Sequence, residues 1–326
     1  MHLSRREFCN ASIAAGASLL PAVSLCATEQ AKAEQANAEQ SKTDTTESAD
    51  WNLNYIVASC MYGKATLAEI LPEIHKTGAN TIEFWAAPHG YQREQIDELG
   101  EEAVKTLLTE HNVEVGSFTC FKHGLFDMQG EMKLVKRLGG DMVICNSRGP
   151  KNLTGDKLKT AVKEFAEELK PHVAAAEEIG VTIGIENHGG GLISSPDSIR
   201  YLFDELKSTR IGLAMAPYHL PQDPALLGKL IEDLDTRLVH IQAWEHGMGC
   251  MMKLPKQQEL MQLPHRGPLD WQPILASLKK INYQGRTEIF MHPVPRGIPI
   301  LPTISEVTAE INQARSYLES LTNQLS

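Results

Sequence analysis

Residues 182–216 read TIGIENHGGGLISSPDSIRYLFDELKSTRIGLAMA, and this stretch contains one complete unit of a repeating pattern. A short apolar run, Thr182–Glu186, is followed by a polar, glycine-rich loop. An amphipathic stretch, Pro196–Lys207, then leads to a second apolar run, Gly212–Ala216. Ser195 supplies a helix cap, and the proline after it suits the first helical position. The stretch therefore predicts strand, helix and strand, the unit from which parallel sheets are built.

The same alternation extends in both directions, from Trp51 nearly to the end of the 326-residue chain. Eight apolar runs are expected to be strands: Tyr55–Cys60, Thr81–Trp85, Glu114–Thr119, Met142–Asn146, Thr182–Glu186, Gly212–Ala216, Leu238–Ala243 and Arg286–Phe290. Eight amphipathic stretches are expected to be helices: Leu67–Lys76, Gln92–His111, Met128–Leu138, Asp156–Ile179, Pro196–Lys207, Pro224–Leu234, Pro268–Ile281 and Ser305–Leu321.

Closure of these strands into a barrel is favoured over an open sheet. The strands are apolar enough to be covered on both sides, which indicates a parallel sheet, and there are eight of them. No glycine-rich dinucleotide turn follows the first strand, where the sequence reads Ala58-Ser59-Cys60-Met61-Tyr62-Gly63. We therefore predict an α/β protein, a single-domain (β/α)8 TIM barrel over residues 51–326.

The first 50 residues follow a different pattern. Ser4-Arg5-Arg6-Glu7-Phe8 is a twin-arginine motif, which together with the short apolar run after it predicts a signal peptide at residues 1–27. Residues 28–50 lack large apolar side chains and are predicted to be a disordered polar linker. We expect export by the twin-arginine route to the periplasm, without a transmembrane segment. Lipid anchoring at Cys26 is disfavoured because Leu25 is bulky for such a site.

The charge balance bears on the partners of the protein. The net charge is −10, from 31 basic and 41 acidic residues, and no basic stripe is present. Binding to nucleic acid is therefore not expected, because neutralising phosphates requires clustered Lys and Arg. The expected partner is a small molecule, and the sequence leaves the formation of a homo-oligomer open.

Three ionisable residues interrupt apolar strands of the predicted barrel: Glu186, His240 and Glu288. A buried carboxylate or imidazole is costly unless something compensates it. Each could pair with a neighbouring Arg, Lys or amide, but three on strands of one barrel favour convergence on a metal ion. Carboxylate and imidazole ligands suit Mn, Co, Zn, Fe or Mg, and the ligand set does not choose among these metals.

The chain resembles the xylose isomerase-like superfamily of sugar phosphate isomerases and epimerases, which includes D-tagatose 3-epimerase-like enzymes. The resemblance covers nearly all of the chain after Trp51. It is carried by five motifs, in this order: Ile185-Glu186-Asn187-His188, Pro217-Tyr218-His219, Val239-His240-Ile241, Arg266-Gly267-Pro268-Leu269-Asp270-Trp271 and Thr287-Glu288-Ile289-Phe290.

The resemblance implies a ligand set and a chemistry. Epimerase-like members hold a divalent metal with Glu, Asp, His and Glu, which here implies Glu186, His240 and Glu288 as metal ligands. The Asp position is Ala216, which has no donor atom, so metal binding is weakened, altered or lost. The resemblance also assigns the two glutamates as the catalytic acid and base, which act through an enediolate. It places His219 against substrate oxygens.

Other residues after strand ends are candidates for substrate binding: His188, His123 and Arg296. The arginine suits a carboxylate or phosphate, and it equally suits a surface ion pair. Residues 244–267 form a long loop with flexible glycines and several methionines. This composition suits a lid over the substrate or a contact between subunits.

Three functions remain open from the sequence. The leading hypothesis is a sugar isomerase or epimerase that acts on a ketose or keto-sugar by metal-assisted proton abstraction next to a carbonyl. A keto-sugar or inositol-type lyase or dehydratase would use the same site. A non-catalytic, carbohydrate-binding barrel with a degenerate metal site is the third, with Ala216 as the mark of decay.

Overall fold

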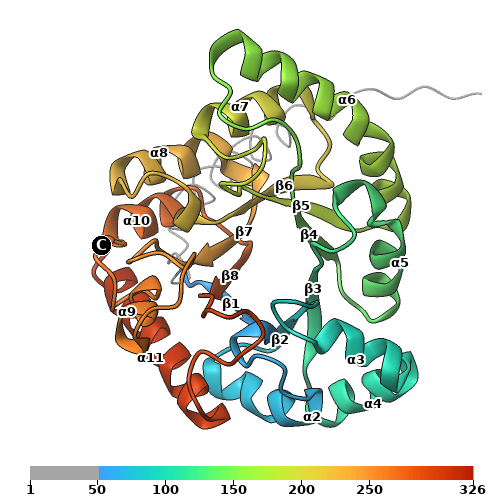
Figure 1. The fold of residues 1–326 in the computed structure, drawn as a ribbon, viewed down its shortest axis with the longest axis vertical. Coiled ribbons are helices and arrows are strands. Elements are labelled where there is room, and N and C mark those ends of the chain that lie inside the picture. The colour runs from blue at the N-terminus through green and yellow to red at the C-terminus, as the bar shows by residue number, and fades with distance from the viewer. Residues whose placement is uncertain (1–50, 326) are drawn as a thin grey trace, which may run out of the picture. The chain divides into compact units, whose positions relative to one another are not determined.

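The computed structural model of the protein describes residues 51–325. The predicted signal peptide (1–27) and linker (28–50), with Cys26, lie outside the described residues. Eight parallel strands form a closed barrel in sequence order, ringed by helices (Figure 1), which confirms the predicted (β/α)8 architecture. The strands are β1 Asn54–Ala58, β2 Thr81–Trp85, β3 Glu114–Thr119, β4 Met142–Asn146, β5 Thr182–Glu186, β6 Ile211–Met215, β7 Leu238–Ala243 and β8 Arg286–Ile289.

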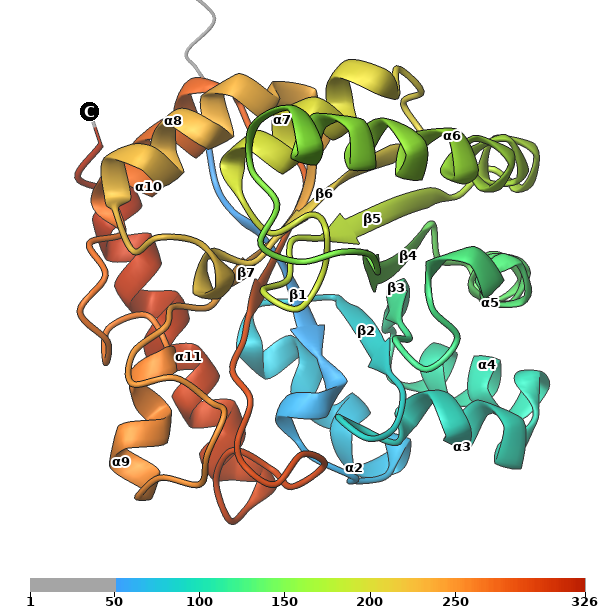
Figure 2. The same ribbon diagram turned by 45° about the horizontal axis from the view of Figure 1, so that its top comes forward.

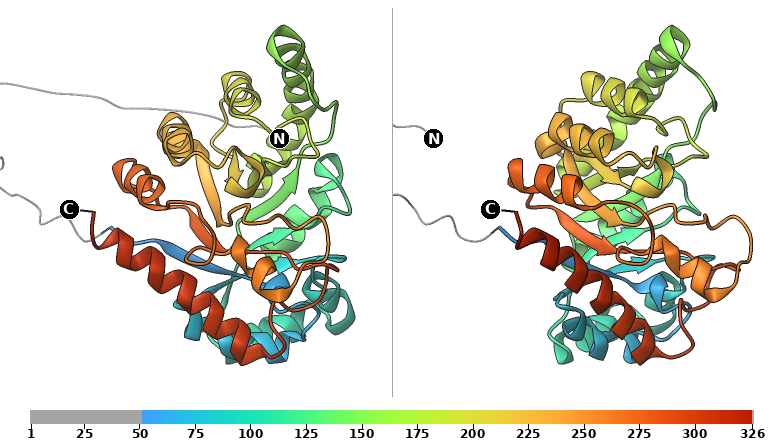
Figure 3. Two further views of the ribbon diagram at one scale, coloured as in Figure 1. Left: turned by 60° about the vertical axis from the view of Figure 1, so that its left-hand side comes forward. Right: turned by 90° about the vertical axis from the view of Figure 1, so that its left-hand side faces the viewer.

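The helices form an outer layer that covers the barrel on all sides (Figure 2). In Figure 3 the strand arrowheads all point toward the end of the barrel where the loop containing the short helix α9 lies. The helices are α2 Leu67–Ile70, α3 Gln92–Leu99, α4 Glu101–Glu110, α5 Gln129–Arg137, α6 Gly155–Ile179, α7 Pro196–Glu205, α8 Pro224–Leu234, α9 Lys256–Glu259, α10 Gln272–Lys280 and α11 Ile304–Thr322.

Local sequence signals explain where several helices begin. Thr66 and Glu69 form a capping box at α2, and Thr303 and Glu306 form one at α11. The hydroxyl of Ser195 accepts a hydrogen bond from a backbone N–H in the first turn of α7. These caps satisfy N–H groups that have no partner within the helix, and so fix the points where the chain leaves the barrel loops.

Two predicted helices are interrupted in the structure. The stretch Gln92–His111 breaks at Gly100, whose φ of 84° ends α3 before α4 begins. The stretch Leu67–Lys76 tightens into a 3-10 helix from Leu71 onward, with Pro72 in its first turn. In both places the apolar pattern continues across the break, which explains why the sequence suggested a single helix.

The inside of the barrel differs from the layer between barrel and helices. The outer layer is a large apolar core built from both strands and helices. Toward the carboxyl ends of the strands the interior holds polar side chains, which include Glu83, Glu186, His240, Gln242 and Glu288, all buried. Among residues 51–325, no helix is both long and apolar enough to cross a bilayer. The fold therefore gathers buried polar side chains from β2, β5, β7 and β8.

Candidate active site

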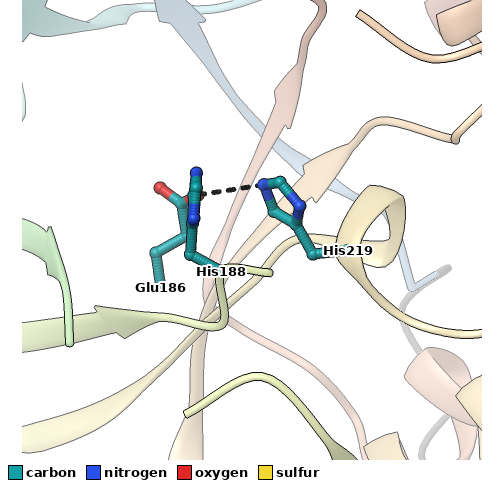
Figure 4. A group of neighbouring side chains, drawn as sticks. All are labelled: Glu186, His188 and His219. Carbon is teal, nitrogen blue, oxygen red and sulfur yellow. Dashed lines mark ion pairs between the residues drawn. The ribbon is translucent and has the colours of Figure 1, made fainter. Parts of the chain in front are cut away.

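The first cluster of polar side chains lies where β5 and β6 end. Glu186 is the last residue of β5, His188 follows it, and His219 ends the short 3-10 helix after β6. Figure 4 shows these three side chains gathered together, with Oε1 of Glu186 3.8 Å from Nε2 of His219. The two imidazole rings lie 4.2 Å apart between centroids. One potential ligand atom from each residue lies within 4.8 Å of the others.

The second cluster joins β2, β7 and β8 and contains a residue that the sequence analysis did not select. Nε2 of His240 lies 3.6 Å from Oε2 of Glu288 and 3.8 Å from Oε2 of Glu83. All three side chains are fully buried. The predicted ligands Glu186, His240 and Glu288 are thus divided between two clusters, and Glu83 accompanies two of them.

The carboxyl groups of both clusters have raised pKa values. Burial, with the charge of Glu288 added, raises the pKa of Glu83 to about 8. Burial raises the pKa of Glu288 to about 8 as well. Burial, together with the charges of Glu288 and Glu83, raises the pKa of Glu186 well above its ordinary value. No Lys or Arg of the described residues forms an ion pair with these three carboxylates.

The histidines are held in their neutral form. Burial lowers the pKa of His240 to about 4 and that of His219 to about 3. Burial also lowers the pKa of His188. Neutral imidazoles can accept a hydrogen bond or bind a metal through one nitrogen, and can donate through the other.

Several buried polar atoms of these clusters have no hydrogen-bond partner within the described structure. They are Oε2 of Glu186, Nε2 of His219, both ring nitrogens of His240, both oxygens of Glu288 and both amide atoms of Gln242. Unsatisfied buried polar groups are costly, and a cluster of them indicates a ligand or an ion. Carboxylate and neutral imidazole donors, without a competing protein cation, fit a divalent metal ion.

The position of the expected aspartate is Ala216, just after β6. Its backbone N–H donates to Oδ1 of Asn187, and its carbonyl accepts from Nδ2 of the same side chain, both at 2.9 Å. The amide of Asn187 thereby extends the pairing of β5 with β6 beyond their last strand residues. Ala216 itself is fully buried and offers no donor atom to a metal.

Two predicted substrate-binding residues, His123 and Arg296, make their hydrogen bonds and ion pairs with residues outside the two clusters, although the pKa values of His188 and His219, lowered by burial, are lowered further by the charge of Arg296. Nε2 of His123 lies 3.5 Å from Oε1 of Glu131, beside the ion pair that Arg93 makes with this glutamate. Arg296 donates to the carbonyl of Pro293 at 2.7 Å and to the carbonyl and sulfur of Cys250, each at 3.2 Å. Arg296 therefore joins the segment after β8 to the loop after β7.

The loop after β7 is held by contacts with the loops on either side of it. The backbone N–H of Cys250 donates to the hydroxyl of Tyr218 at 2.7 Å, and Arg296 contacts the same cysteine from the other side. The ring of Tyr218 stacks on Trp244 at 4.0 Å. These contacts tie the loops that follow β6, β7 and β8 to one another.

Glu245 follows β7 and is buried. It binds the end of this loop, just before α10. It accepts hydrogen bonds from the backbone N–H of Leu269 at 2.6 Å and from the indole of Trp271 at 3.3 Å. Burial raises its pKa to about 7 despite these two donors. Glu245 belongs to neither cluster. It can therefore serve as a comparison, since it is a buried carboxylate whose oxygens accept hydrogen bonds from the protein.

We expect Glu245→Gln to change how stability depends on pH. Between its ordinary pKa and about 7, the folded protein keeps a proton that the unfolded chain has released, so wild-type stability falls as pH rises. Glutamine cannot ionise, so the variant should gain stability relative to wild type between about pH 5 and 7. Thermal unfolding of both proteins across this range measures the difference, and a pH-independent difference would contradict the raised pKa.

Comparison with known proteins shows which family of barrels this chain matches. A family model described as xylose isomerase-like TIM barrel matches residues 71–310. A solved L-ribulose 3-epimerase is 14% identical, with a TM-score of 0.62 over 84% of this chain and 96% of that chain. D-psicose 3-epimerase in the presence of D-fructose is 14% identical, with a TM-score of 0.63 over 83% of this chain and 99% of that chain.

A third structure is that of the IolI protein with a zinc atom. It is 14% identical, with a TM-score of 0.62 over 84% of this chain and 99% of that chain. No curated protein sequence matches the chain. At this level of identity the structural matches establish a shared fold.

Proposed function

Since the chain belongs to the xylose isomerase-like TIM barrel family, we propose that it is a sugar isomerase or epimerase that moves a proton next to the carbonyl of a ketose or keto-sugar. The observation that carries this proposal is the pair Glu186 and Glu288. Both carboxylates are buried at the active end of the barrel, and atoms of both have no protein partner. Solved L-ribulose and D-psicose 3-epimerases with the same fold support the reaction class.

The topology suits a reaction in which a proton leaves one side of a carbon atom and returns on another. Glu186 ends β5 and Glu288 lies in β8, with β6 and β7 between them in the closed barrel. The two carboxyl groups therefore reach the barrel mouth from different directions. In the proposed reaction one carboxylate removes the proton, and the other carboxyl group supplies a proton to the resulting enediolate.

The histidines have roles that follow from their neutral state. His219 and His188 lie beside Glu186 and can hydrogen-bond the hydroxyl or carbonyl oxygens of a sugar. A divalent cation held by residues of these clusters would supply positive charge next to the oxygens of the enediolate. The fit of such a cation rests on the unpartnered carboxylate and imidazole atoms.

We propose that the loop after β7 moves when a sugar enters the site. Glu186 is 2% exposed, and Glu288 is fully buried. In the proposed cycle, the contacts of Cys250 with Tyr218 and Arg296 open to admit the sugar and close to exclude water. The twin-arginine motif and the proposed periplasmic location favour free or oxidised sugars over sugar phosphates as substrates.

Proton exchange with solvent tests this function directly. We expect the full-length protein, supplied with Mn²⁺ or Co²⁺, to incorporate deuterium next to the carbonyl of at least one ketose in D2O, with an epimer or isomer appearing in the NMR spectrum. Removal of the metal by a chelator should abolish the exchange, and adding it back should restore it. A product that has lost water would instead assign a lyase. Absence of exchange across a panel of free and oxidised keto-sugars would refute the proposed reaction.

A further inference from the structure

The geometry points to a divalent-cation site formed by Glu83, His240 and Glu288, in which the carboxylate of β2 replaces the donor that Ala216 lacks. This site differs from the set Glu186, His240 and Glu288 that the family resemblance implies. Its part in catalysis rests on the proposed function, but its existence does not, because metal binding can be measured without a substrate.

The distances between donor atoms fit a shared ion. For ligand bonds of about 2.0–2.2 Å, tetrahedral coordination places neighbouring donor atoms roughly 3.3–3.6 Å apart. Nε2 of His240 lies 3.6 Å from one carboxylate oxygen and 3.8 Å from the other. These separations are too long for hydrogen bonds, and both nitrogens of His240 lack a partner within residues 51–325. The spacing therefore matches donors arranged around an ion better than a hydrogen-bonded cluster.

Glu83 is held in place by side chains of the neighbouring strand. Ser117 donates to its Oε2 at 3.0 Å, and Thr119 donates to its Oε1. Both hydroxyls come from β3, which pairs with β2 in register at Glu83 and Ser117. Metal-binding carboxylates are commonly oriented by such outer hydrogen bonds. Glu83 is thus fixed with its Oε2 toward His240, and lone pairs on both oxygens remain available.

The three residues differ in burial from the cluster at β5 and β6. Glu83, His240 and Glu288 are fully buried, and neither oxygen of Glu288 accepts a hydrogen bond of good geometry, although Glu83, Trp85 and Gln242 lie beside it. In the other cluster His188 and His219 are partly exposed, and Nδ1 of His188 accepts a hydrogen bond from the backbone N–H of Gly190. The buried cluster suits an ion, and the partly exposed one suits a substrate.

In this division only one of the two glutamates proposed as acid and base also binds the cation. Glu288 would bind the cation together with Glu83 and His240. Glu186, with His188 and His219 beside it, would be left free of the metal to exchange a proton with the substrate. The two alternative ligand sets share His240 and Glu288, so they can be distinguished by the residue that completes each set.

Metal titration of two single variants separates the alternatives. Purified full-length wild type, Glu83→Gln and Glu186→Gln are stripped with chelator and titrated with Mn²⁺, with the free ion followed by EPR. We expect wild type to bind one ion, Glu186→Gln to keep this affinity, and Glu83→Gln to bind at least 10-fold more weakly. Glu245→Gln is the matched control, because this buried carboxylate near the same end of the barrel belongs to neither cluster and should leave Mn²⁺ affinity unchanged.

Each other outcome overturns the inference. Tight binding by Glu83→Gln, loss of binding by Glu186→Gln, or absence of Mn²⁺ and Co²⁺ binding by wild type would each do so. Glu83→Gln also alters two buried hydrogen bonds, so circular dichroism and thermal unfolding must show that it is folded. If it does not fold, retention or loss of Mn²⁺ by Glu186→Gln still decides between the two sets. Metal binding through Glu83 without any ketose exchange would refute the proposed reaction and leave the site standing.

Discussion

Replacement of Glu186 by glutamine is expected to lower kcat for the accepted ketose by about 10²–10⁴-fold, the usual contribution of a positioned acid or base. Glutamine preserves the shape of the side chain but cannot accept the substrate proton. Because Glu186 lies outside the Glu83–His240–Glu288 cluster, Mn²⁺ content should stay near the wild-type value. Steady-state kinetics and loss of deuterium exchange measure the effect, while KM should change much less than kcat.

The matched control for this variant is Glu178→Gln, an exposed glutamate near the end of α6. It should leave kcat, KM and thermal stability unchanged within error. A Glu186→Gln protein that retains more than a tenth of wild-type kcat would exclude Glu186 as the main acid or base. Equal loss of metal and activity in that variant would instead make it a ligand.

Replacement of Arg93 by methionine is expected to produce the largest loss of stability among single changes to the ion pairs. Arg93 donates from Nε and Nη2 to the two oxygens of Glu131, at 2.6 and 2.9 Å, and both side chains are nearly buried. Without the guanidinium, Glu131 is left as a buried charge, which typically costs about 3–5 kcal/mol. For a domain of this size the melting temperature should fall by roughly 10 °C.

A double variant and a surface variant make this result interpretable. Arg93→Met/Glu131→Leu removes both buried charges and should recover most of the lost stability, because the one carboxylate left without Arg93, that of Asp97, is exposed to solvent. Arg137→Met breaks the exposed pair with Glu101 and should cost less than about 1 kcal/mol. Equal losses of stability for the buried and exposed pairs would show that the cost of breaking an ion pair does not depend on its burial.

The regular part of the fold was predictable because each strand and helix carries its own periodic signal. Strands β2, β3, β4, β5 and β7 have the predicted bounds. The break at Gly100 could not be read from hydrophobic pattern alone, since only the backbone angle at this glycine shows that the helix stops. The helix α9 was missed because it is a single short turn within a polar loop.

The candidate site was predictable in part, through carboxylates and imidazoles that interrupt apolar strands. Glu83 gives this same signal between Ile82 and Phe84, but it lies outside the five motifs that carry the family resemblance. The sequence spacing could not show that Glu83 lies beside His240, because β2 and β7 come together only when the barrel closes. The grouping of Glu186 with His188 and His219 likewise depends on how the loops fold back.

The hydrogen bonds between Asn187 and the backbone of Ala216 also bear on the history of the site. They involve only main-chain atoms of residue 216, so they would persist with aspartate at this position. Alanine and aspartate codons can differ by a single base, and the backbone that would present an aspartate is still intact. The support of Glu83, by contrast, requires suitable residues at three positions on two strands. The change at residue 216 is therefore the easier one to make or to reverse, and under the proposed metal site the carboxylate on β2 is what allows alanine to stand there.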